Sequence, residues 1–278
     1  MNKLEEIAQN SNYDTYLQRM TNSFQSSSKK FLPLLCKGGK VLDVGCGSGV
    51  LLKEFTQMGF DVKGIDLNQN AIDVCKKENL NAEKIDLSDI KEKYDSIIFS
   101  SVLHEISSYD ETNKFTTSPI IAALFAARNI LNDNGQILIR DGLCGSSQKI
   151  KLIAKDESIV EDFKQYIKDA PMFNEKVLFN THIFISGLKI YAPEDILKEF
   201  LYTYTWGKES YSREVQERYG ILTEKNWIQL CNMLNLKINN IITSEDDYIK
   251  YVSRFFEPNK DLIQTFEKST IIINAQKI

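Results

Sequence analysis

Three glycines at alternating positions are the feature of this sequence that most directly suggests chemistry. Gly45, Gly47 and Gly49 follow the apolar run Val41 to Val44 and precede a segment of helical period. Glycine permits a sharp turn and lets the backbone approach a ligand, and a helix that begins after the turn presents free N–H groups. The loop therefore predicts a site for a nucleotide-like ligand, although turns also collect glycine for structural reasons.

An acidic residue at a defined distance from this loop strengthens the prediction. The second apolar run, Val62 to Ile65, ends at Asp66, which lies 17 residues after Gly49. In dinucleotide sites an acidic side chain about 20 residues further on accepts hydrogen bonds from ribose hydroxyls. The dinucleotide pattern, however, needs a glycine three positions after the second one, where this chain has Val50, and this argues against an NAD site.

The two histidines differ in the chemistry that they offer. His104 comes just after the apolar run at 96–99, where a strand is expected to end, whereas His182 lies in an apolar stretch and is expected to be structural. A neutral imidazole near pH 7 can take a proton from a hydroxyl or ammonium group, so His104 is the candidate catalytic base. The alternative is that His104 packs or caps the turn beside Glu105. Glu105 and Asp141 could lie near the cleft, but no pattern predicts a metal site.

The elements that must position these residues alternate regularly from Gly39 onward. Short apolar runs lie at 41–44, 62–65, 83–85, 96–99 and 136–139, and segments of helical period such as 50–58 and 71–78 separate them. Apolar runs that are this short and are separated by helices are typical of parallel strands covered on both faces. The predicted fold class is α/β, with a doubly wound sheet.

The regular alternation stops after Asp141. Residues 145–222 are predicted to be mostly helical, and regularity returns at Thr223, a plausible helix N-cap before 224–234. Strands are expected near 237–243 and 270–275. We therefore expect an N-terminal helical lid segment (1–38), one α/β domain (39–144 and 223–278), and a helical insertion after the fifth strand (145–222).

The residues around the glycine loop resemble the first motif of the class I S-adenosylmethionine-dependent methyltransferases. That motif is an acidic residue followed by a GxGxG loop, and the chain matches it as VLDVGCGSG from Val41 to Gly49. The resemblance is close over 39–142 and looser over 223–276. It implies a Rossmann-like sheet of seven strands, methyl transfer as the reaction, and S-adenosylmethionine as the cofactor.

The resemblance also implies roles for the residues of the loop itself. The backbone of Gly45, Cys46, Gly47 and Gly49 would pack against the methionine part of the cofactor. Asp43 would orient the cofactor's amino group, or would instead make a structural hydrogen bond beneath the loop.

Further along the chain, the resemblance implies a second group of cofactor contacts. Asp66, with Leu67 beside it, would meet the two ribose hydroxyls, and Asp86 with the Leu87 amide would address the adenine edge. The alternative for Asp86 is a surface turn or a helix cap. Ser100, at the end of the fourth strand, would line the cleft near the sulfonium.

Two segments could cover the cleft. Residues 145–222 hold 12 of the chain's 29 aromatic residues but nearly balanced charge, which favours an apolar or planar acceptor over long nucleic acid. Tyr202, Tyr204 and Trp206 alternate as in an extended segment and are the candidate substrate contacts, unless the rings form the insertion's own core. From the N-terminal side, Tyr13, Tyr16 and Arg19 could close over the cofactor, with Arg19 meeting its carboxylate, or could form a solvated helix face.

The composition limits the possible partners. The net charge of -4 creates no field toward nucleic acid or an anionic membrane. The longest apolar run, Ile120 to Ala127, is far shorter than the roughly 20 residues that span a bilayer, and the N-terminus lacks a signal-peptide pattern, so we expect a cytoplasmic protein without a membrane partner. Five widely spaced cysteines without a CxxC pair argue against a disulfide framework or zinc.

These observations favour an S-adenosylmethionine-dependent methyltransferase that acts on an oxygen or nitrogen atom of a small molecule. Two alternatives stay open: the same reaction on RNA, a peptide or a protein, and a non-catalytic subunit that binds S-adenosylmethionine for a partner enzyme. The sequence indicates no particular oligomeric state.

Overall fold

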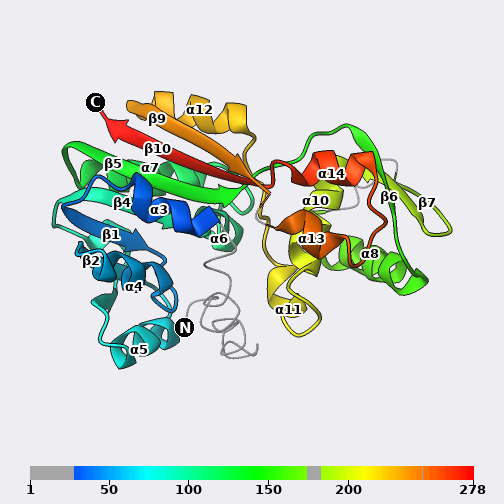
Figure 1. The fold of residues 1–278 in the computed structure, drawn as a ribbon, viewed down its shortest axis with the longest axis horizontal. Helices are drawn as coiled ribbons and strands as arrows, with labels where there is room; N and C mark the ends of the chain where they lie inside the picture. Colours follow the sequence, from blue (N-terminus) through cyan, green and yellow to red (C-terminus); the bar gives the residue numbers. More distant parts are fainter. Residues whose placement is uncertain (1–27, 174–182, 246) are drawn as a thin grey trace.

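The computed structural model describes residues 28–173, 183–245 and 247–278. Two parts lie side by side in Figure 1: a large sheet flanked by helices, which we call the sheet domain, and a smaller part, which we call the cap. Among the helices of the described ranges, none is long and apolar enough to cross a membrane.

The sheet domain contains the predicted seven-stranded sheet. Its first five strands run parallel, and the last strand of the chain is inserted antiparallel between the fifth strand and the edge strand. In spatial order the strands are β3 (Ala82–Lys84), β2 (Asp61–Asp66), β1 (Lys40–Val44), β4 (Tyr94–Ser100), β5 (Leu131–Gly142), β10 (Thr270–Lys277) and β9 (Leu236–Ser244).

Helices cover both faces of this sheet, as the short apolar runs predict. Alternate residues of one strand enter different cores: Leu42 packs on one side of the sheet and Val41 on the other. One face carries α6 (Leu103–Tyr109), α7 (Ser118–Asn129) and α12 (Glu224–Met233). The other face carries α3 (Phe31–Leu35), α4 (Val50–Gln57) and α5 (Gln69–Lys77). Two short 3-10 turns, η1 (Ser28–Lys30) and η2 (Leu87–Asp89), complete this part.

The cap is less purely helical than expected for residues 145–222. It contains α8 (Glu157–Asp169), α10 (Glu194–Tyr204) and α11 (Tyr211–Glu214). It also contains an antiparallel sheet in the order β6 (Lys149–Ile153), β8 (Lys189–Pro193), β7 (Phe184–Ser186). These strands are short and do not alternate with helices. The alternation of apolar runs and helical segments, which predicted the parallel strands, therefore did not indicate them.

The cap also includes a second segment of the chain, which the expected boundaries place in the sheet domain. Between β9 and β10 the chain leaves the large sheet and forms α13 (Tyr248–Val252) and α14 (Lys260–Phe266), which lie with the cap in Figure 1. Phe256 and Phe266 share one buried core with Phe163 and Phe200. The expectation that all of residues 223–278 belong to the sheet domain is therefore wrong for the middle of that range. Phe256 and Phe266 are buried in the core of the cap.

Candidate functional site

The glycine loop connects β1 to α4 and requires glycine at specific positions. Gly45, Gly47 and Gly49 all have positive φ, of 70°, 52° and 79°. A Cβ atom on Gly45 would lie 2.4 Å from Cγ2 of Val102, and one on Gly49 would lie 2.5 Å from Cδ1 of Leu80. The backbone N–H of Gly45 donates to the carbonyl of Ile65 at 2.8 Å. The loop is thus held tightly against the ends of β2 and β4.

Asp66 completes the loop from the end of β2. Its Oδ2 accepts a hydrogen bond from the Gly47 N–H at 2.9 Å, and its Oδ1 accepts one from the Asn68 N–H at 2.8 Å. Each carboxylate oxygen has a further lone pair that can accept from a hydroxyl group. Burial raises the pKa of Asp66, and these two backbone donors oppose that rise. The sequence-predicted pair of loop and acidic residue is therefore one connected structure.

A cavity of about 540 Å³ opens above the loop, at the carboxyl end of the parallel strands. Most of the cofactor residues implied by the resemblance line this cavity: Asp43, Gly45, Cys46, Gly47, Asp66, Leu67, Asp86, Leu87 and Ser100. Gly49 does not line it and serves the packing of the loop instead. Arg19, Tyr13 and Tyr16 lie outside the described residues.

Asp86 and Asp43 also have the structural roles that the sequence left open as alternatives to cofactor contact. The Asp86 carboxylate accepts a hydrogen bond from the Ser88 N–H at 2.8 Å, so Asp86 caps η2 while it lines the cavity. Asp43 is buried beneath the loop, and burial raises its pKa to about 7, with Lys29 opposing and Asp66 adding to the rise. Lys29 is buried and also lines the cavity, although no sequence motif includes it.

Ser100 ends β4 with its hydroxyl group in the cavity wall. The side chain is 8% exposed, and its Oγ has no hydrogen-bond partner within the described part of the chain. A buried polar atom without a partner is costly unless a ligand or water satisfies it. Ser100 thus marks a point of the cavity where a polar ligand atom fits.

His104 has a different environment from the one expected of a catalytic base. It lies at the start of α6, is 5% exposed, and is absent from the cavity lining. Its Nδ1 lies 2.6 Å from Oδ1 of Asp141, its Nε2 lies 3.6 Å from Oε2 of Glu217, and its ring stacks on Tyr219. Each of these contacts joins the imidazole to a buried side chain.

The charge state of His104 also argues against the base role. Burial alone lowers the pKa of His104, but the carboxylates of Asp141 and Glu217 outweigh burial and raise the pKa well above 6.5. A protonated imidazole has no lone pair with which to accept a proton. The structure therefore favours the alternative, in which His104 is a buried structural residue beside Glu105.

His104 belongs to a set of buried charged side chains between the sheet domain and the cap, which we call the charge cluster. The set comprises His104, Glu105, Asp141, Arg213, Glu214 and Glu217. Arg213 lies at its centre, with Nη2 3.1 Å from Oε1 of Glu105 and Nε 3.3 Å from Oε1 of Glu217. The Tyr109 hydroxyl donates to Glu217 at 2.8 Å, and Tyr219 donates to Glu214.

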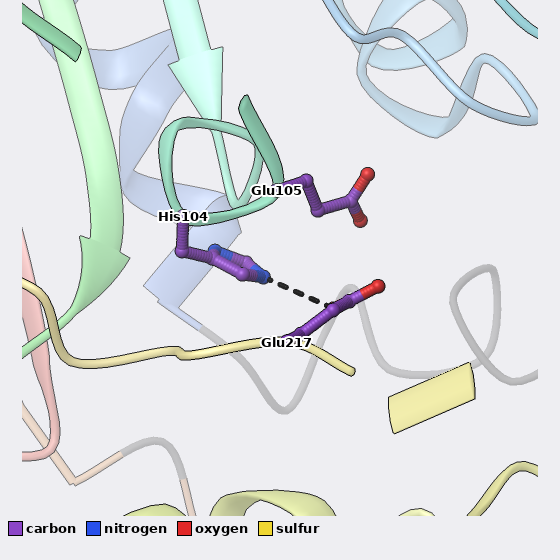
Figure 2. A group of neighbouring side chains, drawn as sticks. All are labelled: His104, Glu105 and Glu217. Carbon is purple, nitrogen blue, oxygen red and sulfur yellow. Dashed lines mark ion pairs between the residues drawn. The ribbon is translucent and has the colours of Figure 1, made fainter. Parts of the chain in front are cut away.

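Figure 2 shows three members of the charge cluster whose donor atoms could in principle hold a cation. The imidazole of His104 points toward Glu217, and Glu105 extends from the same helix beside them. One ligand atom from each of the three lies within 4.8 Å of the others. Arg213 already forms ion pairs with both glutamates, however, so the arrangement is that of an ion-pair network.

Glu105 and Arg213 are the members of the charge cluster that face the cavity. They enter its lining from opposite parts of the molecule, since Glu105 lies on α6 and Arg213 on α11 of the cap. The only signal for Arg213 in the sequence was the charged run around 213–217 in an otherwise aromatic insertion.

The three aromatic residues predicted to contact substrate are not brought to this cavity. Tyr202 and Tyr204 lie in helix α10 and not in an extended segment. Tyr202 is 1% exposed, and its hydroxyl donates to the carbonyl oxygens of Leu143 and Ser269. Tyr204 and Trp206 pack against the cap core. The structure agrees with the alternative, in which these rings form the core of the insertion.

Comparisons with known proteins agree with this geometry. A family model described as a methyltransferase domain matches residues 16–186. An uncharacterized methyltransferase of Alkaliphilus oremlandii is 28% identical over 171 residues, which are 56% of this chain and 71% of that protein. A ubiquinone biosynthesis O-methyltransferase of Paraburkholderia phymatum is 44% identical over 45 residues, which are 16% of this chain and 19% of that protein.

Among solved structures, a SAM-dependent methyltransferase from Archaeoglobus fulgidus shares the fold. It has a TM-score of 0.51 and 13% sequence identity, and the similarity covers 94% of each chain.

Proposed function

The chain belongs to the methyltransferase-domain family of S-adenosylmethionine-dependent enzymes, and from this premise we propose that it methylates an oxygen or nitrogen atom of a small molecule. The observation that carries the proposal is the continuity of the cavity. The same space is lined by the cofactor motifs, from Asp43 to Ser100, and by Arg213 of the cap. A donor and a small acceptor can therefore meet inside it.

The residues at the loop end of the cavity fit S-adenosylmethionine. Asp66 would accept from the ribose hydroxyls, Asp86 and Leu87 would lie at the adenine edge, and the loop backbone would follow the methionine part. Lys29 would sit near the charged groups of that part, beside Asp43. When bound, the cofactor supplies a methyl group activated by the positive sulfonium.

The cavity wall formed by α6 and the cap is suited to hold the acceptor. Val102, Ile106 and Tyr109 supply an apolar wall there, and Glu105 and Arg213 supply charge. In methyl transfer the protein contributes chiefly by aligning the two reactants, excluding water and taking up the acceptor's proton. The cavity walls would align the reactants and exclude water, and Arg213 of the cap forms part of these walls.

A small acceptor agrees better with this site than a long nucleic acid does. The cap segment 145–222 has 11 basic and 12 acidic residues, so it offers no excess of positive charge for a phosphate backbone. The relative from Paraburkholderia phymatum is named for a step in ubiquinone biosynthesis, which is consistent with a small-molecule acceptor.

Binding and turnover together test the proposal. Calorimetry should show binding of S-adenosylmethionine by the purified chain, and absence of binding would contradict the proposed activity. The protein is then incubated with isotope-labelled S-adenosylmethionine and separate small-molecule and macromolecular fractions of a cell extract. Label in the small-molecule fraction is expected. Label in RNA or protein, or turnover only after a partner protein is added, would favour the other two functions.

A further inference from the structure

The charge cluster contains more carboxylates than cations. Four carboxyl groups, those of Glu105, Asp141, Glu214 and Glu217, share two cationic side chains, His104 and Arg213. Asp141, Glu214 and Glu217 are each at most 3% exposed, so water cannot stabilise an excess of negative charge there.

Without a further cation, protons compensate this excess. Burial and the neighbouring Glu217 raise the pKa of Glu105 to about 7, against the lowering effect of Arg213. Burial and Glu217 likewise raise the pKa of Glu214 to about 8. Oε1 of Glu214 has no hydrogen-bond partner among the residues that the structure describes. Within the described part of the chain, the cluster therefore holds fewer cations than carboxylates, and a further positive charge would stabilise it.

Only one of these carboxylates can meet a ligand in the cavity. Glu105 lines the cavity with a side chain that is 20% exposed, whereas Asp141, Glu214 and Glu217 are absent from its lining. Its Oε1 accepts from Arg213, and within the described ranges no hydrogen bond reaches its Oε2. Oε2 is therefore available to a donor from the cavity.

Glu105 lies near the glycine loop, and therefore near the expected position of the methyl group that is transferred. Val102, one turn before Glu105, lies in contact distance of the Cβ position of Gly45. Ser100, with its unpartnered Oγ, lies just before them in the chain and lines the same cavity. A carboxylate and a hydroxyl group thus line the same cavity near the glycine loop, and each can accept a hydrogen bond from a cationic ligand.

We propose that the acceptor is a primary or secondary amine, and that Glu105 binds its ammonium group and takes its proton. The proposal rests on the proposed methyltransferase function and specifies its substrate class. In the step, the ammonium loses one proton to the Glu105 carboxylate, and the freed nitrogen lone pair forms the new N–CH₃ bond. The C–S electron pair remains on sulfur, which becomes a neutral thioether, and Glu105 later releases the proton to water.

An anionic acceptor agrees less well with the same surroundings. The guanidinium of Arg213 is already engaged by Glu105 and Glu217, so it has little capacity for another anion. Asp110 and Glu111 add two more acidic side chains to the cavity lining. The charges along the cavity wall formed by α6 and the cap therefore favour a cation.

A cofactor analogue tests this proposal without knowledge of the acceptor. Sinefungin carries an ammonium-forming amine at the position of the transferred methyl group, whereas S-adenosylhomocysteine has no group there. If Glu105 faces that position, sinefungin should bind at least about tenfold more tightly than S-adenosylhomocysteine, because the ion pair adds charge-assisted hydrogen bonds. Calorimetry gives both dissociation constants.

A matched pair of variants assigns the preference to Glu105. Glu105→Gln should remove most of the preference for sinefungin while leaving the affinity for S-adenosylhomocysteine within about threefold. Glu161→Gln, which removes an exposed carboxylate on α8 of the cap, should leave both affinities unchanged. An unchanged preference in folded Glu105→Gln protein would overturn the proposal.

The wild-type protein provides a second measurement that does not depend on a variant. Among the described residues, the charged and titratable groups that interact with Glu105 are His104 and Tyr109 on α6, Asp66 at the end of β2, and Arg213, Glu214 and Glu217 in the cap. The preference for sinefungin should decrease as the pH falls through about 7, because Glu105 then becomes neutral. A preference that is constant from pH 8.5 to 5.5 would contradict the proposal.

The outcomes separate this proposal from the proposed function. If neither analogue binds, the methyltransferase function itself is wrong. If S-adenosylhomocysteine binds and sinefungin binds no better, the methyltransferase function stands and the amine acceptor is rejected, which would favour a hydroxyl acceptor.

Discussion

The Nη2 atom of Arg213 in the cap lies 3.1 Å from Oε1 of Glu105 in the sheet domain, although the two residues are 108 positions apart in the chain. Both line the cavity, so this ion pair joins the two parts of the molecule at the wall of the functional site. Loss of Arg213 would leave Glu105 and Glu217 without their shared cationic partner in a largely buried place, where an unpaired charge is costly. The cap and the cofactor cavity are therefore energetically connected.

Substitution Asp66→Ala should weaken binding of S-adenosylmethionine at least about tenfold. The variant loses the ribose acceptor, worth on the order of 1.5–3 kcal/mol as a set of charged hydrogen bonds, and also the contact that holds the Gly47 N–H. Calorimetry measures the change. Asp73→Ala on the exposed face of α5 is the control and should bind normally. Equal affinities of the two variants would remove Asp66 from the site.

Substitution Gly45→Ala should destabilise the protein by about 2–4 kcal/mol, because the new Cβ would overlap Val102 and the backbone has a φ of 70°. Gly47→Ala should cost only about 1–2 kcal/mol, since no atom of the described residues, its chain neighbours aside, lies within 4 Å of its Cβ position. Urea denaturation measures both. The double variant Gly45→Ala, Val102→Ala should recover part of the loss, and equal losses at the two glycines would contradict this account.

Substitution His104→Gln should reduce stability by about 3 kcal/mol at pH 6, because Asp141 and Glu217 lose a buried cationic partner. Since the pKa of His104 is raised in the folded protein, its stabilising effect is complete below about pH 6.5 and is lost as the pH rises through the raised pKa. The difference from wild type should therefore be smaller at pH 9 than at pH 6. Urea denaturation across pH measures it.

The same variant decides between the two roles of His104. A hundredfold fall in kcat with an unchanged free energy of unfolding would restore the catalytic base role that the sequence suggested. A loss of stability, with binding of S-adenosylmethionine retained by the folded fraction, is the result expected of a structural residue.

Substitution Tyr202→Phe should lower the free energy of unfolding by about 1–2 kcal/mol and leave binding of S-adenosylmethionine unchanged. Its hydroxyl satisfies the carbonyls of Leu143 and Ser269, which lie next to β5 and β10, so the loss affects the junction of cap and sheet. Tyr204→Phe, which loses one hydrogen bond to Asp162, is the control and should cost less. An altered KM for the acceptor in Tyr202→Phe alone would contradict the structural assignment.

The strand–loop–helix unit of the candidate site could be predicted from local sequence. The run at 41–44, the glycines and the following helix are contiguous in the chain, so a short pattern contains the whole strand–loop–helix unit. Thr223 was likewise predicted as an N-cap, and its side chain accepts from the Asn226 N–H at 3.2 Å. In each case the interacting groups are close in sequence, and backbone geometry brings them together.

The aromatic segment shows where a local pattern misleads. Alternation of Tyr202, Tyr204 and Trp206 suggested an extended strand, but the first two lie in α10. Tyr202 packs against Phe266, which belongs to a segment more than 60 residues away. An alternation of three rings fits a strand or a helix, and burial against distant elements decided between them.

The sequence by itself determined the parallel sheet, the glycine loop and the position of Asp66, because period, turn residues and spacing are local properties of the chain. Only the tertiary structure decided that Asp141 and Glu217 enclose His104, and that Glu105 meets Arg213 at the cavity. The physical reason is that the pKa of a buried group depends on charges that folding brings near it and on the water that folding removes. Neither the nearby charges nor the loss of water can be inferred from the residues adjacent to His104 or Glu105 in the chain.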